Sequence, residues 1–98
     1  MQFEKNENGT VLKITLDKKL SAVTAEQLEK ELDGKLTGVK DLTIDMAKLA
    51  YVSSAGLRVL LKAQKTMNKQ GSMVIKNVSD EIKEIFEVTG FDELLTIE

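Results

Sequence analysis

The chain of 98 residues has the size of one domain and can bury one modest hydrophobic core, so a single domain over residues 1–98 is expected. It contains no cysteine and no histidine, which excludes disulfides, thiolate metal sites and serine–histidine catalytic pairs. Its formal net charge of −2 gives no general attraction to nucleic acid or to an acidic membrane surface.

The N-terminal segment contains acidic side chains and lacks the apolar stretch that a signal peptide needs. No apolar run elsewhere approaches the roughly 18–20 residues of a membrane-spanning helix. We therefore expect a cytoplasmic protein, a location that also fits a chain without cysteine.

Two short strands are predicted at the start of the chain. Asn8 and Gly9 favour a β-hairpin with a type I′ turn, because that turn needs positive φ at both central residues. The first strand lies around Phe3. In the second strand, over residues 10–17, apolar side chains alternate with polar ones, which predicts that one face of the strand is buried.

A first helix is predicted to begin at Thr24. Thr24 and Gln27 have the spacing of a capping box, and Gly38 suggests that the helix ends between Lys35 and Thr37. Its apolar side chains recur at three- and four-residue spacing and form one stripe, consisting of Ala25, Leu28, Leu32 and Leu36.

The middle of the chain predicts strand, helix and strand. A strand over residues 42–46 is followed by a loop and then by a helix that begins at Ser53 or Ser54 and runs to about Lys69. Residues 73–75 form a short, continuously apolar run, as expected of a buried parallel strand.

A third helix is predicted after Ser79, with Asp80 and Glu81 in its first turn, and Gly90 ends it. Residues 94–97 could add an edge strand. The order of elements predicts an α/β fold, with a mixed sheet of four to five strands, an N-terminal hairpin and about three helices packed on it.

One stretch resembles a known family. Residues 45–61 read DMAKLAYVSSAGLRVLL, which is similar to the signature of the STAS family, of the anti-sigma factor antagonist type. In these proteins a strand and a short loop lead to a serine at a helix start, followed by a small residue, glycine, leucine and an apolar helix. Residues 20–32 also resemble the family, whose members have a loop entering a T-A-x-x-L helix there.

The resemblance implies a partner-switching protein. An antagonist of this type binds an anti-sigma factor and so frees a sigma factor for transcription. The anti-sigma factor is also a kinase that phosphorylates one serine of the antagonist with ATP; the phosphorylated form no longer binds, and a phosphatase restores it. Alignment on Gly56 places that serine at Ser54, with Ser53 as second choice.

This chain departs from the family at two positions of the predicted partner surface. Ser53 and Ser21 stand where many phosphorylated members have aspartate. The residues expected at that surface are Ser21, Tyr51, Ser53, Ser54, Ala55, Gly56, Arg58 and Lys62.

Several of these residues have simpler interpretations. Serine is among the commonest helix caps, glycine in a helix allows close packing, and Tyr51 could support the core. Arg58 and Lys62 belong to a basic stripe that continues through Lys65 and Lys69. Such a stripe is usually a solvated helix face, and the alternative is a docking strip for an acidic partner.

Two functions remain open at the level of sequence. The first is the regulatory antagonist, either a monomer or a weak dimer. The alternative is a STAS subunit without reversible phosphorylation, in a transport complex of the phospholipid ABC type or in a signalling scaffold. An enzyme is not expected, because no catalytic constellation is visible, and no metal site, cofactor, direct nucleic-acid contact or direct membrane contact is predicted.

Overall fold

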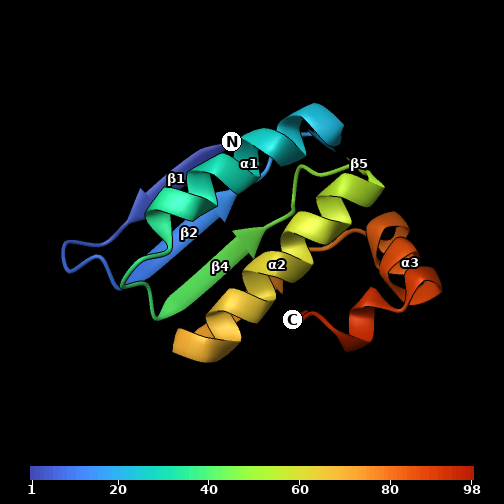
Figure 1. Ribbon diagram of the computed structural model, residues 1–98. Coiled ribbons are helices and arrows are strands. Elements are labelled where there is room, and N and C mark those ends of the chain that lie inside the picture. The colour runs from blue at the N-terminus through green and yellow to red at the C-terminus, as the bar shows by residue number, and fades with distance from the viewer.

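The computed structural model describes residues 1–98 and contains a main sheet of four strands in the order β1-β2-β4-β6 (Figure 1). β1 runs antiparallel to β2, whereas β2, β4 and β6 are parallel to one another. The predicted mixed sheet with an N-terminal hairpin is confirmed. The bounds of these strands are Gln2–Lys5 for β1, Val11–Thr15 for β2, Asp41–Asp45 for β4 and Ser72–Lys76 for β6.

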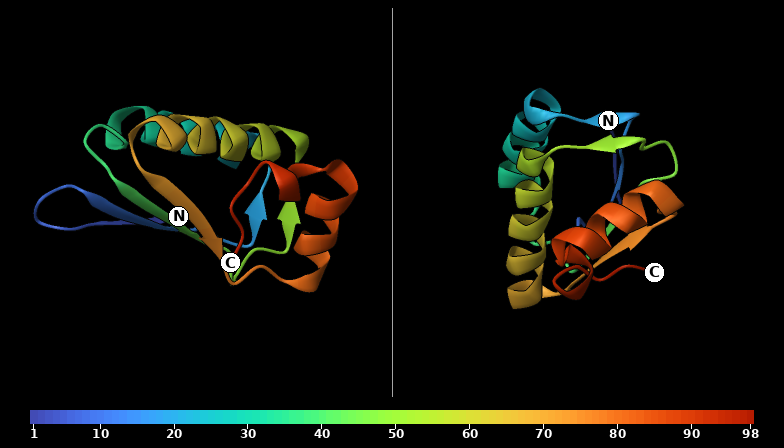
Figure 2. Two further views of the ribbon diagram at one scale, coloured as in Figure 1. Left: turned by 90° about the horizontal axis from the view of Figure 1, so that it is seen from below. Right: turned by 90° about the vertical axis from the view of Figure 1, so that its right-hand side faces the viewer.

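Three α-helices pack on this sheet, as the sequence predicted. α1 (Ala22–Lys35) and α2 (Ser54–Gln70) lie side by side over one face. α3 (Asp80–Thr89) lies beyond the C-terminal ends of the parallel strands, next to the N-terminal half of α2 (Figures 1 and 2). None of the helices has the length and apolar composition needed to cross a lipid bilayer.

The hydrophobic core lies between the sheet and the helices. Alternate strand residues point into it, and parallel pairing in register aligns them in two buried rows. Burying one such side chain stabilises the fold by about 1.5–3 kcal/mol. The rows are Leu12–Leu42–Met73 and Ile14–Ile44–Ile75, and α2 and α3 cover them with the fully buried Leu60, Met67 and Phe86.

A second, small sheet was not predicted from the sequence. β3 (Lys19–Leu20) and β5 (Tyr51–Val52) pair in parallel, and each leads directly into a helix (Figure 2). Strands of two residues have no detectable periodicity, so the sequence suggested only loops at these positions. The pairing matters because it sets the relative position of the starts of α1 and α2.

The hairpin turn differs from the predicted type I′ turn. Gly9 has a φ of 71°, but Asn8 does not have positive φ. The loop is instead closed by the side chain of Asn6, whose Oδ1 accepts hydrogen bonds from the backbone N–H groups of Thr10 and Val11, both at 2.9 Å. These bonds organise a longer loop, in which only the glycine needs the left-handed conformation.

The first helix begins two residues earlier than predicted. Its N-cap is Ser21, and Ser21 and Thr24 form the capping box that the sequence suggested for Thr24 and Gln27. Thr24 cannot act as the cap, because its hydroxyl donates to the Lys19 carbonyl oxygen at 3.0 Å and accepts from the Ser21 N–H at 2.7 Å.

The C-terminal segment adds less than a full strand. A short 3-10 helix, η1 (Phe91–Glu93), follows α3. Beyond it, a single parallel bridge joins Ile97 to Ile75 at the free edge of β6. The predicted edge strand is therefore reduced to one bridge, and the main sheet has four strands.

Candidate functional site

The small sheet brings two helix starts together. Lys19 pairs with Tyr51 and Leu20 with Val52, and the Ser53 N–H donates to the Leu20 carbonyl oxygen at 2.9 Å. Since α1 and α2 follow these strands directly, their N-caps lie on neighbouring segments of chain. Both helices then run in the same direction away from this end (Figures 1 and 2).

The two serines at the start of α2 have different roles. Ser53 is the N-cap: its Oγ accepts a hydrogen bond from the Gly56 N–H at 3.0 Å, and its carbonyl oxygen accepts from the Leu57 N–H at 2.9 Å. Ser54 is the first helical residue, is exposed, and takes no part in the cap. The interpretation as a helix cap therefore describes Ser53 and not Ser54.

The first turns of α1 and α2 contain no acidic residue, in contrast to α3, which has Asp80 and Glu81 there. A helix N-terminus has a partial positive charge from its aligned peptide dipoles. Two such ends thus lie next to each other without a negative side chain of their own, and Ser21 and Ser53 supply neutral caps.

At Gly56, α2 packs closely against the small sheet. A Cβ atom on Gly56 would lie 2.9 Å from Cδ2 and from Cγ of Leu20, which is closer than real Cβ contacts. This confirms that close packing requires the glycine. The partner is the end of β3, and the contact presses the start of α2 against the residue that precedes the cap of α1.

Tyr51 does not support the core as predicted, because its side chain is 50% exposed. Side chains alternate along β5, so Val52 points inward and is buried, while Tyr51 points out. Val23, in the first turn of α1, is 66% exposed and was missed because the helix was predicted to start after it. The spacing of Ser21 and Thr24 would have been the signal for the earlier start. The exposed side chains of Tyr51 and Val23 give this end of the molecule an apolar character.

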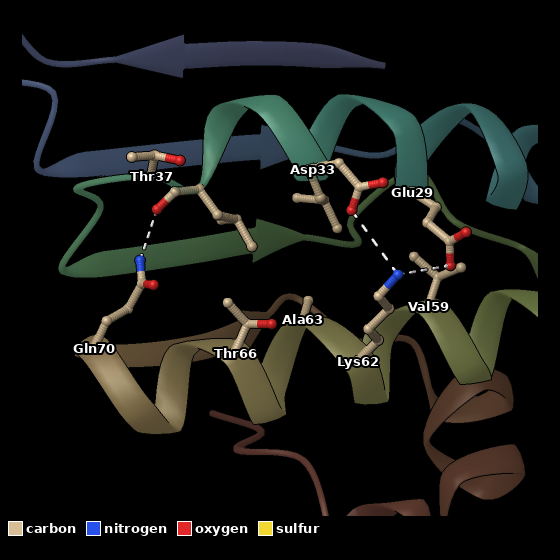
Figure 3. Close-up of a pocket in the computed structure, with 10 residues that line it drawn as sticks. Glu29, Asp33, Thr37, Val59, Lys62, Ala63, Thr66 and Gln70 are labelled. Carbon is tan, nitrogen blue, oxygen red and sulfur yellow. Dashed lines mark hydrogen bonds and ion pairs between the residues drawn. The ribbon is translucent and has the colours of Figure 1, made fainter.

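Lys62 is held in place by α1. Its Nζ lies 3.6 Å from Glu29 Oε2 and 3.9 Å from Asp33 Oδ1, across the hollow between α1 and α2 (Figure 3). At the far end of this hollow, Gln70 Nε2 donates to the Leu36 carbonyl oxygen at 2.6 Å. Lys62 thus joins the two helices, and its predicted role in partner binding stays a prediction.

The other cations of the basic stripe are exposed and form no ion pair with the chain's own carboxylates, as shown by the full set of pairs. They are Arg58, Lys65 and Lys69. Of these, Arg58 is nearest in sequence to Ser54, four residues further along α2.

The loop before β5 is anchored by Asp45. Its Oδ1 accepts hydrogen bonds from the Ala47 N–H at 2.9 Å and from Asn77 Nδ2 at 3.1 Å. These two bonds, the backbone one first, hold the pKa of the Asp45 carboxyl below its ordinary value. The anchor fixes the course of the chain between β4 and Tyr51.

This end of the molecule therefore presents an exposed hydroxyl on a rigid helix start, beside apolar and cationic side chains. No group of three His, Cys, Asp or Glu side chains in the chain is placed to hold a metal ion. The arrangement suits contact with another protein.

Comparison with known proteins gives a consistent result. The profile of the STAS domain matches residues 2–98. BtrV of Bordetella bronchiseptica, which carries the name of an anti-sigma factor antagonist, is 38% identical over 74 residues, or 74% of this chain and 64% of BtrV. The anti-sigma-B factor antagonist of Staphylococcus aureus is 29% identical over 80 residues, or 80% of this chain and 74% of that protein.

Solved structures show the same fold. The unphosphorylated anti-sigma factor antagonist SpoIIAA has a TM-score of 0.84 at 17% identity, covering 99% of this chain and 86% of SpoIIAA. The phosphorylated form of SpoIIAA from Bacillus has a TM-score of 0.70 at 16% identity, covering 99% of this chain and 89% of that one.

Proposed function

Because this chain belongs to the STAS domain family, we propose that it acts as an anti-sigma factor antagonist that binds an anti-sigma factor with kinase activity and releases it when Ser54 is phosphorylated. The observation that carries this proposal is the position of Ser54. It is an exposed hydroxyl at the start of α2, and the capping hydrogen bond is made by Ser53 instead.

A phosphate on Ser54 is compatible with the fold. In the transfer, Ser54 Oγ bonds to the γ-phosphorus of ATP, the bond from that phosphorus to the β-phosphate oxygen breaks, ADP leaves and the hydroxyl proton is lost. The modified residue gains about −1.5 to −2 charge near a helix N-terminus, where negative charge is favourable. The modification therefore changes the surface and leaves the core intact.

The same charge explains how the partner would be released. A protein that packs against this end of the molecule would have to bury a dianion, which costs several kcal/mol when the charge is unpaired. Since about 1.4 kcal/mol corresponds to a tenfold change in affinity, this is enough to separate the partners. A phosphatase that removes the phosphate would restore binding.

The partner surface that we propose surrounds Ser54. Tyr51 and Val23 supply exposed apolar area, and tyrosine is enriched where proteins bind one another. Arg58 adds a cation without an intramolecular partner. The remaining predicted members are less free: Ser21 and Ser53 serve as helix caps, and Gly56 packs against Leu20. Ala55 is half-buried and Lys62 pairs with Glu29.

Ser53 is a weaker candidate for modification than Ser54. Its Oγ is engaged by the Gly56 N–H and the residue is half-buried, so a kinase would have to break the cap to reach it.

The second candidate function is a STAS subunit of a transport or signalling complex that is never phosphorylated. It is favoured by one observation, namely that Ser53 and Ser21 replace aspartates found in many phosphorylated members.

The test is mass spectrometry of the protein isolated from its own cells in growth and under stress, together with partner binding by the Ser54→Ala, Ser54→Asp and Ser53→Ala variants. We expect a phosphate on Ser54 whose occupancy changes between conditions, and a bound partner with kinase activity that transfers phosphate from ATP to Ser54 in vitro. If no phosphate appears and Ser54→Asp binds the same partners as the unmodified chain, the constitutive subunit is the better function.

A further inference from the structure

Arg58 is the only arginine among the 14 basic side chains of the molecule, and it lies one helical turn after Ser54. Both residues are exposed. Side chains four residues apart share one face of a helix, with Cβ atoms about 5–6 Å apart. Long side chains in a helix lean back toward its N-terminus, so Arg58 covers the turn that contains Ser54.

The guanidinium of Arg58 has no anionic partner although carboxylates are close. Glu26 and Glu29 of α1 line the same shallow hollow as Arg58. Each is already engaged, because Glu26 pairs with Lys30 at 3.5 Å and Glu29 with Lys62 at 3.6 Å. None of the ion pairs of the structure includes Arg58. The guanidinium is therefore available to an anion that is added to this face.

We propose that Arg58 pairs with the phosphate on Ser54 within α2, an inference that rests on the proposed function and adds its regulation. A guanidinium donates two parallel N–H bonds to phosphate oxygens, a geometry that lysine does not offer. The order is also the favourable one, since an anion placed four residues before a cation stabilises a helix more than the reverse.

The pair has a consequence for the switch. In the unmodified protein, Arg58 is free to contact an acidic group of the partner. In the phosphorylated protein, the same guanidinium is held by the phosphate of its own helix. Phosphorylation therefore changes two groups at once: it adds a dianion at Ser54 and withdraws the cation at Arg58 from the partner.

The test uses chains in which phosphoserine is inserted at position 54 during translation, so that no kinase is required. The chain with Arg58 is compared with Arg58→Gln, which preserves helix propensity, and with Lys65→Gln. Lys65 is the matched control, because it is another exposed, unpaired cation of α2, seven residues beyond Arg58. The measured quantity is the pKa of the phosphate, obtained by ³¹P NMR.

We expect Arg58→Gln to raise the phosphate pKa by about 0.2–0.4 unit, the size of an exposed pair of this spacing. Lys65→Gln should change the pKa much less, since at physiological salt charges more than about 8 Å apart are screened. The single arginine also gives a single Nε–H resonance, which should shift on phosphorylation and titrate together with the phosphate.

Equal phosphate pKa values in the two variants, with an Nε–H resonance that does not respond to the phosphate, would overturn the pairing. Because the phosphate is installed without a kinase, this result would leave the proposed function standing. Conversely, a Ser54 that is never phosphorylated in cells would overturn the proposed function, while the measured pair would remain a property of the helix.

Discussion

The α-carbon of Gly56 faces Leu20 so closely that a methyl group on it would lie 2.9 Å from the Leu20 side chain and 3.0 Å from its carbonyl oxygen. The carbonyl cannot move freely, because it accepts the hydrogen bond from the Ser53 N–H. This contact packs the start of α2, with its cap residue, against the end of β3. The packing fixes the position of Ser54.

Gly56→Ala is therefore expected to destabilise the protein by about 1–3 kcal/mol, the usual cost of overpacking. Gly34 is a matched control, since it lies in α1 with nothing within 4 Å of an added Cβ. Gly34→Ala should stabilise by roughly 0.5–1 kcal/mol, because alanine is the better helix former. Urea denaturation of both variants measures the change in the free energy of unfolding, which should have opposite signs. Equal changes would mean that Leu20 shifts at little cost to accommodate the added methyl group.

The two serines at the start of α2 should contribute differently to the stability of the protein. Ser53→Ala removes the side-chain acceptor of the Gly56 N–H and is expected to cost about 1 kcal/mol. Ser54→Ala removes an exposed hydroxyl outside the cap and should change the free energy of unfolding by less than about 0.5 kcal/mol. Thermal unfolding of both variants tests the assignment. A larger loss of stability in Ser54→Ala than in Ser53→Ala would show that Ser53 is not the cap.

Most of the fold could be predicted because its main elements have strong periodic patterns. The alternation in β2 and the stripe Ala25–Leu28–Leu32 are set by which face each element buries, and the structure buries those side chains. α2 ends at Gln70, one residue beyond the predicted Lys69, and Gly90 caps the end of α3 as the sequence predicted. At the candidate site, the serine–alanine–glycine start of α2 was visible because capping and packing constrain residue type.

The rest of the site depends on contacts between segments that no local pattern encodes. Pairing of β3 with β5 involves two residues on each side, and the orientation of Tyr51 follows from that pairing. The start of α1 was misplaced because Thr24 has two possible roles in a capping box, and only its bond to the Lys19 carbonyl oxygen distinguishes them. Likewise, the engagement of Lys62 by Glu29 needs the packing of α1 on α2.

Asp45 gives the protein a defined dependence of stability on pH. Its pKa is lowered in the folded state, so its contribution is complete above the unfolded value of about 3.9 and is lost as the pH falls through the folded pKa. Asp45→Asn should therefore be less stable than the unmodified protein at pH 7, with a difference that shrinks near pH 3. Urea denaturation at both pH values measures it.

A second variant isolates one of the two hydrogen bonds of Asp45. Asn77 donates from its side chain and has a φ of 60°, a conformation that glycine adopts readily. Asn77→Gly keeps that backbone and removes the donor, so the pH dependence should be reduced but not abolished, since the bond from Ala47 remains. An unchanged pH profile in Asp45→Asn would assign the acid sensitivity to other carboxylates.

The exposed apolar side chains beside Ser54 should matter for binding and not for folding. Tyr51→Ala and Val23→Ala remove side chains that are 50% and 66% exposed, so the free energy of unfolding should change by less than about 0.5 kcal/mol. If the partner packs on this end, each truncation should weaken binding of the kinase by about 1–2 kcal/mol, or roughly 5- to 30-fold.

Val88 is the matched control for this experiment, because it is 81% exposed and lies in the last turn of α3, outside the two helix starts that form the proposed surface. Val88→Ala should leave the affinity unchanged, as measured by titration calorimetry with the purified kinase. Loss of binding in all three variants would indicate a much larger interface that includes α3. Loss of binding in Val88→Ala alone would place the partner surface on α3, and Ser54 would then no longer lie at its centre.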